Sequence, residues 1–297
     1  MLPVKSFTVT IKRAGWDPLV LECGSTGSAL RGICTLEEGG QSYRNNAEIT
    51  IYGIDADHLK NYSSLALHQG KTVSTPETIT VASEGKILFS GDSYLTFADF
   101  SRFPNISLRV SASFGFSAAL TQKPQFTIEK DSKLKFTAAA DLLLAELNQD
   151  LGLAGQPGQI TARYSDSVKN IQCPAMTLTG TSIDKLHNLA YALGLHRVID
   201  HTGAYFWVPG QEYPAEFTAE KPEVSVDTGL IRYPVFYNEG IAFAVSTTGV
   251  WKVGDKIKIK SEVPYADGEY FIIHQHIEMS TLPGGKWETN YNATYAI

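Results

Sequence analysis

His274 and His276 come nearest to the spacing of a metal site in this sequence. Residues two positions apart on a strand point to the same face, so both imidazoles could reach one ion. Glu278 is the one obvious third ligand close by. Because a zinc site takes three or four protein ligands, we expect side chains of a half-exposed strand here and assign no metal.

Three further histidines, His187, His196 and His201, cluster around one helical segment and the strands that follow it. Charged residues are near His187 and His196 in the sequence, but their spacing matches no catalytic or metal-binding pattern and is what chance would give. We therefore expect ordinary surface positions for these histidines.

Glu37 and Glu38 could be considered as the acid pair of a glycosidase. Adjacent residues on a strand point to opposite faces, so these two carboxylates cannot flank one glycosidic bond. We expect them to lie in a turn instead.

A set of aromatic residues could stack against sugar rings: Tyr205, Phe206, Trp207, Trp251 and Trp287. The first three follow one another, and alternation along a strand buries one side of it in any sheet. We therefore favour core and interface packing over sugar binding for this set.

Motifs of catalysis are missing from the sequence. It has no phosphate-cradling glycine loop, no Gly-x-Ser-x-Gly elbow and no metalloprotease His-Glu pattern. The cysteines, Cys23, Cys34 and Cys173, form no Cys-x-x-Cys pair, which predicts free, partly buried thiols in a reducing compartment. We assign no catalytic, cofactor-binding or metal-binding residues, expect no cofactor, and predict that the protein is not an enzyme.

Three lysines, Lys256, Lys258 and Lys260, alternate with Ile257 and Ile259. The alternation predicts three ammonium groups on one face of a strand and two isoleucines in a core. A solvated face, protection of a sheet edge and contact with an acidic partner each account for the lysines. We expect them to face outward or toward another subunit.

Composition narrows the classes of function. The chain has 297 residues, of which 43% are hydrophobic, 19% are charged and 25 are glycines, as in a folded, turn-rich protein. A net charge of -6 and a pI near 5.7 disfavour stable nucleic-acid binding. No apolar run approaches the about 18 residues of a membrane span, and the N-terminus lacks the apolar core of a signal peptide.

Residues 1–120 alternate between apolar and polar positions and predict a mostly-β barrel domain with one helix. Gly53 ends a strand, and Asp55 is predicted to cap a helix whose apolar face carries Leu59, Tyr62 and Leu65. The segment SEGK is predicted to be a tight turn between TITVA and ILFSG.

Helical spacing then appears twice, in residues 121–175 and 176–222, each predicted to be a small α+β unit. In the second unit Thr181 and Ser182 are the candidate N-caps, and a hairpin follows the helix. The two units are either an internal duplication or two solutions to one packing problem. The apolar helix faces are predicted to be Ala139, Leu142, Leu143, Leu147 and Leu151 in the first unit and Ile183, Leu186, Leu189, Ala190 and Leu193 in the second.

Residues 223–297 return to strands and predict a second β-barrel domain. The fold class is therefore mostly β with α+β insertions, in which two β-barrel domains flank two small α+β units.

This order of segments resembles the central baseplate hub proteins of contractile-tailed bacteriophages, a tail tube-type family, and the resemblance implies that the two β-barrel domains are tube-type β-barrel domains. The stretches that carry the resemblance are AEITIYGIDADHLKNYS, GKILFSGDSYLTFADFSRFPNISLRVSA, GTSIDKLHNLAYALGLHRVIDHTGAYFWVPG, and DTGLIRYPVFYNEGIAFAV followed by GVWKVGDKIKIKSEVPYADGEYFIIHQHIEMSTLPGGKWETNY. They extend over nearly the whole chain, from about Phe7 to Tyr295.

The resemblance implies a structural virion protein made in the host bacterial cytoplasm and located in the tail baseplate. It implies a homotrimer that joins the six-fold tail tube to the three-fold spike, and contacts with the tail tube protein, the spike protein and the C-terminus of the tape measure protein. DNA would pass through its channel without specific binding. The alternatives are a hub-like minor tail protein of a long flexible tail, a spike component of a phage-derived secretion system or pyocin, and a glycan-degrading or glycan-binding tail protein.

Overall fold

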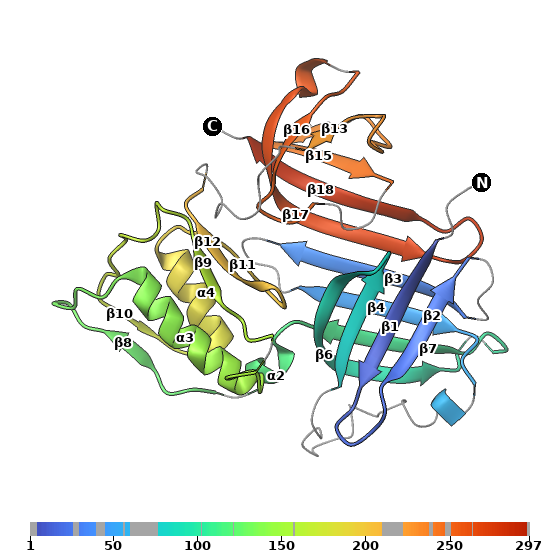
Figure 1. Cartoon of the computed structure of the whole chain (residues 1–297), viewed down its shortest axis with the longest axis horizontal. Coiled ribbons are helices and arrows are strands. Elements are labelled where there is room, and N and C mark those ends of the chain that lie inside the picture. Colours follow the sequence, from blue (N-terminus) through green and yellow to red (C-terminus); the bar gives the residue numbers. More distant parts are fainter. Residues whose placement is uncertain are drawn as a thin grey trace.

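The computed structural model describes residues 5–25, 30–39, 45–55, 57–59, 77–101, 103–120, 122–156, 158–209, 222–237, 240–246, 251–262 and 264–295. A large, mainly antiparallel sheet dominates the molecule, and a smaller unit of helices and short strands lies beside it (Figure 1). The predicted class, mostly β with α+β insertions, is confirmed. No helix among the described residues is long and apolar enough to cross a membrane.

The N-terminal part of the sheet is antiparallel and runs in the order β3-β4-β7-β6-β5-β1-β2. It bends into a nearly closed barrel, because β2 meets the start of β3 through a bridge between Cys23 and Leu30. Alternate residues fill one core, as in β4, where Ala47, Ile49 and Ile51 are buried. The strands are β1 (Ser6–Lys12), β2 (Leu19–Gly24), β3 (Arg31–Gly39), β4 (Asn46–Tyr52), β5 (Thr78–Ser83), β6 (Lys86–Asp99) and β7 (Ser107–Ser113).

Two local predictions in this part are confirmed. Gly53 has φ +85°, and the Asp55 carboxylate accepts a hydrogen bond of 2.8 Å from the backbone N–H of His58. The SEGK segment is a tight turn between β5 and β6, in which Glu84 and Gly85 both have positive φ. Leu59 is buried, whereas Tyr62 and Leu65 lie outside the described residues.

The C-terminal strands form a second small barrel. Its antiparallel run is β16-β17-β18-β15-β14, and β13 pairs with β16 in parallel. A bridge between Leu230 and Val245 links the segment after β13 to β15 and closes the barrel. The strands are β13 (Glu223–Val224), β14 (Val235–Tyr237), β15 (Gly240–Val245), β16 (Lys256–Ile259), β17 (Gly268–Ser280) and β18 (Trp287–Tyr295).

One pair of strands joins the two barrels into a single sheet. β17 pairs with β3 from His274↔Gly39 to Ser280↔Ile33. β17 therefore contributes to both cores, with Tyr270 in the C-terminal core and Met279 in the N-terminal one.

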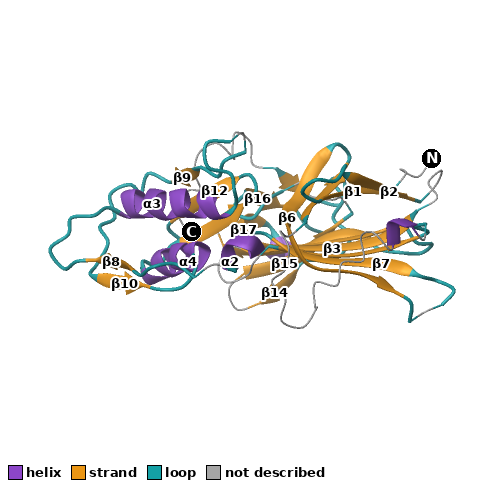
Figure 2. Cartoon of the chain, turned by 90° about the horizontal axis from the view of Figure 1, so that it is seen from below, coloured by secondary structure: helices purple, strands orange, loops and turns teal. Residues whose placement is uncertain are grey.

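The helical residues form a unit beside the barrels (Figure 2). Its helices pack against each other, β8 pairs with β10, and β9 pairs with β12 in parallel. One hydrophobic core contains residues of both predicted α+β segments, so the two segments share their packing; the exact domain boundaries stay predictions. The elements are α2 (Phe116–Ala119), β8 (Phe126–Ile128), α3 (Phe136–Asp150), β9 (Ala162–Tyr164), β10 (Met176–Leu178), α4 (Ser182–Ala192), β11 (His196–Asp200) and β12 (Gly203–Trp207).

The predicted helix faces hold with one exception. Leu143 and Leu147 of α3 are buried, but Leu142 is 56% exposed, and Leu144 and Ala140 are buried instead. The core of α3 lies on a face turned slightly away from the predicted one, because α4 packs on that side.

Candidate functional site

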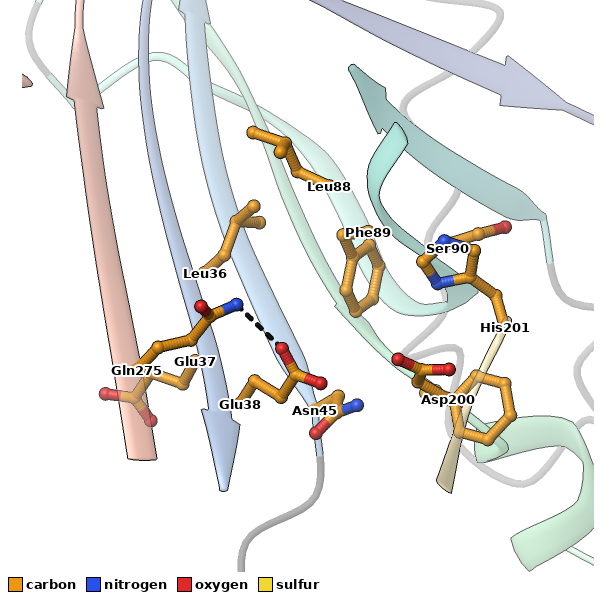
Figure 3. A pocket seen from close by; sticks show the side chains of 11 residues that line it. Leu36, Glu37, Glu38, Asn45, Leu88, Phe89, Ser90, Asp200, His201 and Gln275 are labelled. Atoms are coloured by element: carbon orange, nitrogen blue, oxygen red, sulfur yellow. Dashed lines mark hydrogen bonds between the residues drawn. The ribbon is translucent and has the colours of Figure 1, made fainter. Parts of the chain in front are cut away.

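A small cavity lies where three parts of the molecule meet (Figure 3). Glu38 near the end of β3, Gln275 of β17, and Asp200 with His201 at the turn between β11 and β12 line it. The space open to the centre of a water molecule is 20 Å³, enough for about one water. A cavity of this size suits a buried polar contact and is too small for a sugar.

Polar contacts hold two sides of this cavity. Gln275 Nε2 donates a hydrogen bond of 2.7 Å to Glu38 Oε2. Asp200 Oδ1 accepts from the backbone N–H of Thr202 at 2.6 Å and of Gly203 at 3.1 Å, which fixes the β11–β12 turn. Glu38 Oε1 and Gln275 Oε1 are buried and have no hydrogen-bond partner among the described residues.

Burial sets the charge states around the cavity. Burial, and then repulsion from the Asp200 carboxylate, raises the pKa of Glu38 to about 8, against the attraction of Lys252. Burial also raises the pKa of Asp255 to about 6. The pKa of His201 is lowered, mainly by burial. At neutral pH the Glu38 carboxyl group therefore keeps its proton, and His201 is neutral.

The positions of Glu37 and Glu38 correct a prediction. Both lie on β3 rather than in a turn, opposite His276 and Gln275 of β17. Glu37 Oε1 lies 3.3 Å from His276 Nδ1, whereas Glu38 bonds to Gln275. The pair cannot act on one bond, because the two side chains leave the strand on opposite faces.

His274, His276 and Glu278 lie two residues apart on β17, as their spacing predicts. His276 Nε2 is 4.0 Å from Glu278 Oε1, and Glu278 Oε2 accepts a bond of 2.9 Å from Lys286. Burial lowers the pKa of His274. Within the described part of the chain, no three His, Cys, Asp or Glu side chains are grouped to hold a metal ion.

The other histidines are half-buried, which corrects the expected surface positions. His187 Nδ1 accepts a bond from the buried Arg197 guanidinium, and the His196 ring packs edge-on against Trp207 with 5.6 Å between ring centroids. His201 lines the cavity. His196 and His201 lie where the helical unit meets the barrels, whereas His187 joins α4 to β11 within the helical unit; the sequence reveals neither arrangement.

Core packing is confirmed for the aromatic residues, but both sides of β12 are buried rather than one. Phe206 belongs to the core of the helical unit, whereas Tyr205 and Trp207 belong to the core of the C-terminal barrel. Trp251 is buried in the same barrel core, and Trp287 is partly buried against the N-terminal one. β12 thus fixes the helical unit to the barrel.

The row of lysines around β16 has the predicted orientation. Ile257 and Ile259 are fully buried in the barrel core, and Lys258 and Lys260 are exposed. Lys256 is half-buried, lies 2.8 Å from Glu269 and packs over the Phe271 ring. The predicted free thiols are also confirmed: all three cysteines are unpaired and buried.

The two ends of the sheet order, β14 and β2, expose apolar side chains. Val235 and Phe236 of β14 are 64% and 45% exposed, and Val20 of β2 is 53% exposed. Sequence reasoning missed this surface. The signal was present, because the run Tyr233 to Tyr237 has bulky residues at consecutive positions that cannot all face one core.

The architecture defines a class: two small barrels joined edge to edge in one sheet, with a helical unit docked beside them. Two solved structures with a similar fold are tail proteins. A tail protein from Neisseria meningitidis MC58 matches with TM-score 0.61 and 11% identity over 97% of this chain and 96% of that one. The 43 kDa tail protein of prophage MuSo2 from Shewanella oneidensis matches with TM-score 0.62 and 10% identity over 97% and 98%.

A third similar structure is the E. coli c3393 protein, a component of the type VI secretion system described as structurally similar to the T4 bacteriophage tail proteins gp27 and gp5. It matches with TM-score 0.57 and 9% identity over 96% of this chain and 76% of that one. No protein-family model and no curated protein matches this sequence. The chain thus has the fold of these proteins without detectable similarity in sequence.

Proposed function

We propose that this chain is a structural, non-enzymatic component of a bacteriophage tail and, more specifically, the homotrimeric baseplate hub between the six-fold tail tube and the three-fold spike. The observation that carries the proposal is the pair of barrels fused through β3 and β17 in a fold shared with tail proteins over almost the whole chain. Three chains would bring together six barrels and so match a six-fold tube.

Exposed sheet edges support an assembled ring. An unpaired, apolar edge strand is a surface on which another chain adds its own strand. β14 is such an edge at the end of the sheet order in the C-terminal barrel, whereas β2, at the other end, is already bridged to the start of β3. In this proposal the partners are two further copies, the tail tube protein, the spike protein and the C-terminus of the tape measure protein, in the baseplate of the virion.

The net charge of -6 supports a role around DNA without binding it. Stable DNA binding rests on lysine and arginine contacts that release counterions from phosphates. A hub that lines the DNA channel must let the genome slide, and an acidic chain lowers the attraction that would retard it.

The oligomeric state tests the proposal. Light scattering should give the mass of a trimer, alone or after addition of the spike protein, and electron images should show a three-fold ring with a central pore. A monomer at all concentrations, with and without the spike protein, would contradict the hub.

A component of a phage-derived secretion system is a second candidate, supported by the similarity to the type VI secretion protein. The two candidates differ in the particle that carries the chain. Mass spectrometry of purified infectious virions should detect it if it is a phage hub. Its presence only in contractile particles without a genome would favour the secretion component.

A further inference from the structure

We propose that Glu38 and Asp200 share one proton across the cavity, and that this proton fixes the β11–β12 turn of the helical unit to the end of β3 in the N-terminal barrel. Both carboxyl groups line the same small cavity and face each other across it (Figure 3). The inference does not depend on the proposed function.

The cavity has more buried hydrogen-bond acceptors than donors to pair with them. Gln275 Nε2 bonds to Glu38 Oε2, which leaves Glu38 Oε1 and Gln275 Oε1 as buried acceptors without a partner in the described chain. The Asp200 Oδ1 bonds come from its own turn, from Thr202 and Gly203. A proton on Glu38 Oε1 supplies a donor that links the barrel to this turn.

The surrounding charges favour that proton. From the turn, Asp200 faces Glu38 beside a neutral His201; from the segment before β16, Asp255 and Lys252 act in opposite directions. Burial of the carboxyl group is the largest effect, and it raises the pKa of Glu38 to about 8. The other titratable groups nearby are Glu37 of β3, His274 and His276 of β17, and Tyr291 of β18, whose pKa is raised.

The sign of the pH dependence follows. An acid whose pKa is higher in the closed form keeps its proton there while the open form loses it. From about pH 4.5 to about pH 8, opening therefore becomes easier by up to about tenfold per pH unit, and the effect levels off above that. The lowered pKa of His201 and His274 acts oppositely, below about pH 6.5.

Glu38→Gln separates these effects, because an amide keeps a donor and an acceptor but cannot ionise. The matched control is Glu37→Gln, at the adjacent, half-exposed carboxylate. Infrared titration of the wild type should show one carboxylic-acid carbonyl band at neutral pH that disappears near pH 8. The band should be absent in Glu38→Gln and retained in Glu37→Gln.

Hydrogen exchange of the backbone N–H groups of Thr202 and Gly203 gives the second measurement. Relative to Glu38→Gln, opening of the turn in the wild type should increase by up to about 100-fold between pH 6 and pH 9. If Glu38→Gln does not fold, Asp200→Asn replaces it. This variant should still show the carboxylic-acid band of Glu38, but the band should disappear at a lower pH than in the wild type, because the repulsion from the Asp200 carboxylate is gone. A wild type without the band at neutral pH, or a band that Glu38→Gln leaves in place, would overturn the proposal.

Discussion

At the scale of single residues, Ile257 and Ile259 carry the packing of β16. Both are fully buried in the C-terminal core. Replacing either by alanine should lower the free energy of unfolding by about 2–4 kcal/mol, because it removes buried methyl groups and leaves a cavity. Chemical denaturation measures the loss. The exposed Lys258→Ala is the control and should change stability by less than about 1 kcal/mol; equal losses in both variants would contradict the packing.

His274 and His276 allow a test for metal binding. The His276 ring lies 3.3 Å from Glu37 and 4.0 Å from Glu278, and His274 is half-buried. Replacing both histidines by asparagine should leave assembly unchanged and cost only modest stability. Elemental analysis should give the same metal content for the purified wild type and the double variant. A metal lost together with infectivity would restore a metal role.

For single residues, the sequence predicts which side chains are buried better than it predicts which residues they contact. Alternation placed Ile257 and Ile259 in a core correctly, because period two alone determines which side chains share a face. It could not reveal that Glu38 and Asp200 line the same cavity, because nothing local to either residue indicates that β3 and the β11–β12 turn meet. The turn expected for Glu37 and Glu38 was wrong for the same reason: the pairing of β3 with β17 continues the strand.

At the scale of elements, the start of α4 is specified by its own residues. Thr181 Oγ1 accepts a hydrogen bond of 3.3 Å from the backbone N–H of Asp184. The Thr181 hydroxyl also donates a bond of 2.7 Å to the Asp184 carboxylate. Ser182, the other predicted cap, instead donates a bond of 2.6 Å to Asp150 at the end of α3. Local signals predicted where the helix begins, but tertiary contact decided which hydroxyl caps it.

Thr181→Ala should therefore lower the free energy of unfolding by about 1 kcal/mol, because the first turn of α4 loses its acceptor. Thr181→Ser keeps the hydroxyl and should retain most of the stability. Thermal unfolding followed by circular dichroism compares the two variants. Similar losses in both would show that packing of the Thr181 methyl group, and not the cap, is responsible.

The edge strand β14 gives a second prediction at this scale. Val235 is 64% exposed at the end of the sheet order, where a lysine blocks strand addition. Val235→Lys should leave the monomer folded and weaken self-association, measured by light scattering over a range of concentrations. Leu142→Lys is the matched control, because Leu142 is similarly exposed but lies on α3. Unchanged association of Val235→Lys would exclude β14 from the subunit contact.

At the scale of the whole molecule, the order of barrel, helical segments and barrel could be predicted, but its connection could not. Turn residues and periodicity act within about ten positions, whereas β3 and β17 pair across most of the chain. The same limit hid the shared core of the helical segments and the burial of both faces of β12. The long-range pairs also join both barrels into one continuous sheet, whose order ends at β14 and β2.

The lysines around β16 provide the prediction for the assembly. Lys256 is already paired with Glu269, whereas Lys258 and Lys260 are exposed and form no ion pair within the described ranges. If they face an acidic surface of another subunit or partner, Lys258→Glu with Lys260→Glu should weaken assembly strongly at low salt and little at high salt, because salt screens exposed charges.

Sedimentation of the wild type and the double variant at two salt concentrations makes the measurement. Lys256→Glu is the control, since it breaks a contact inside the chain and should lower the stability of the monomer by less than about 1 kcal/mol without this salt dependence. A folded double variant that assembles like the wild type at both concentrations would show that the exposed lysines are only solvated, and the contact between subunits would then rest on the apolar sheet edges.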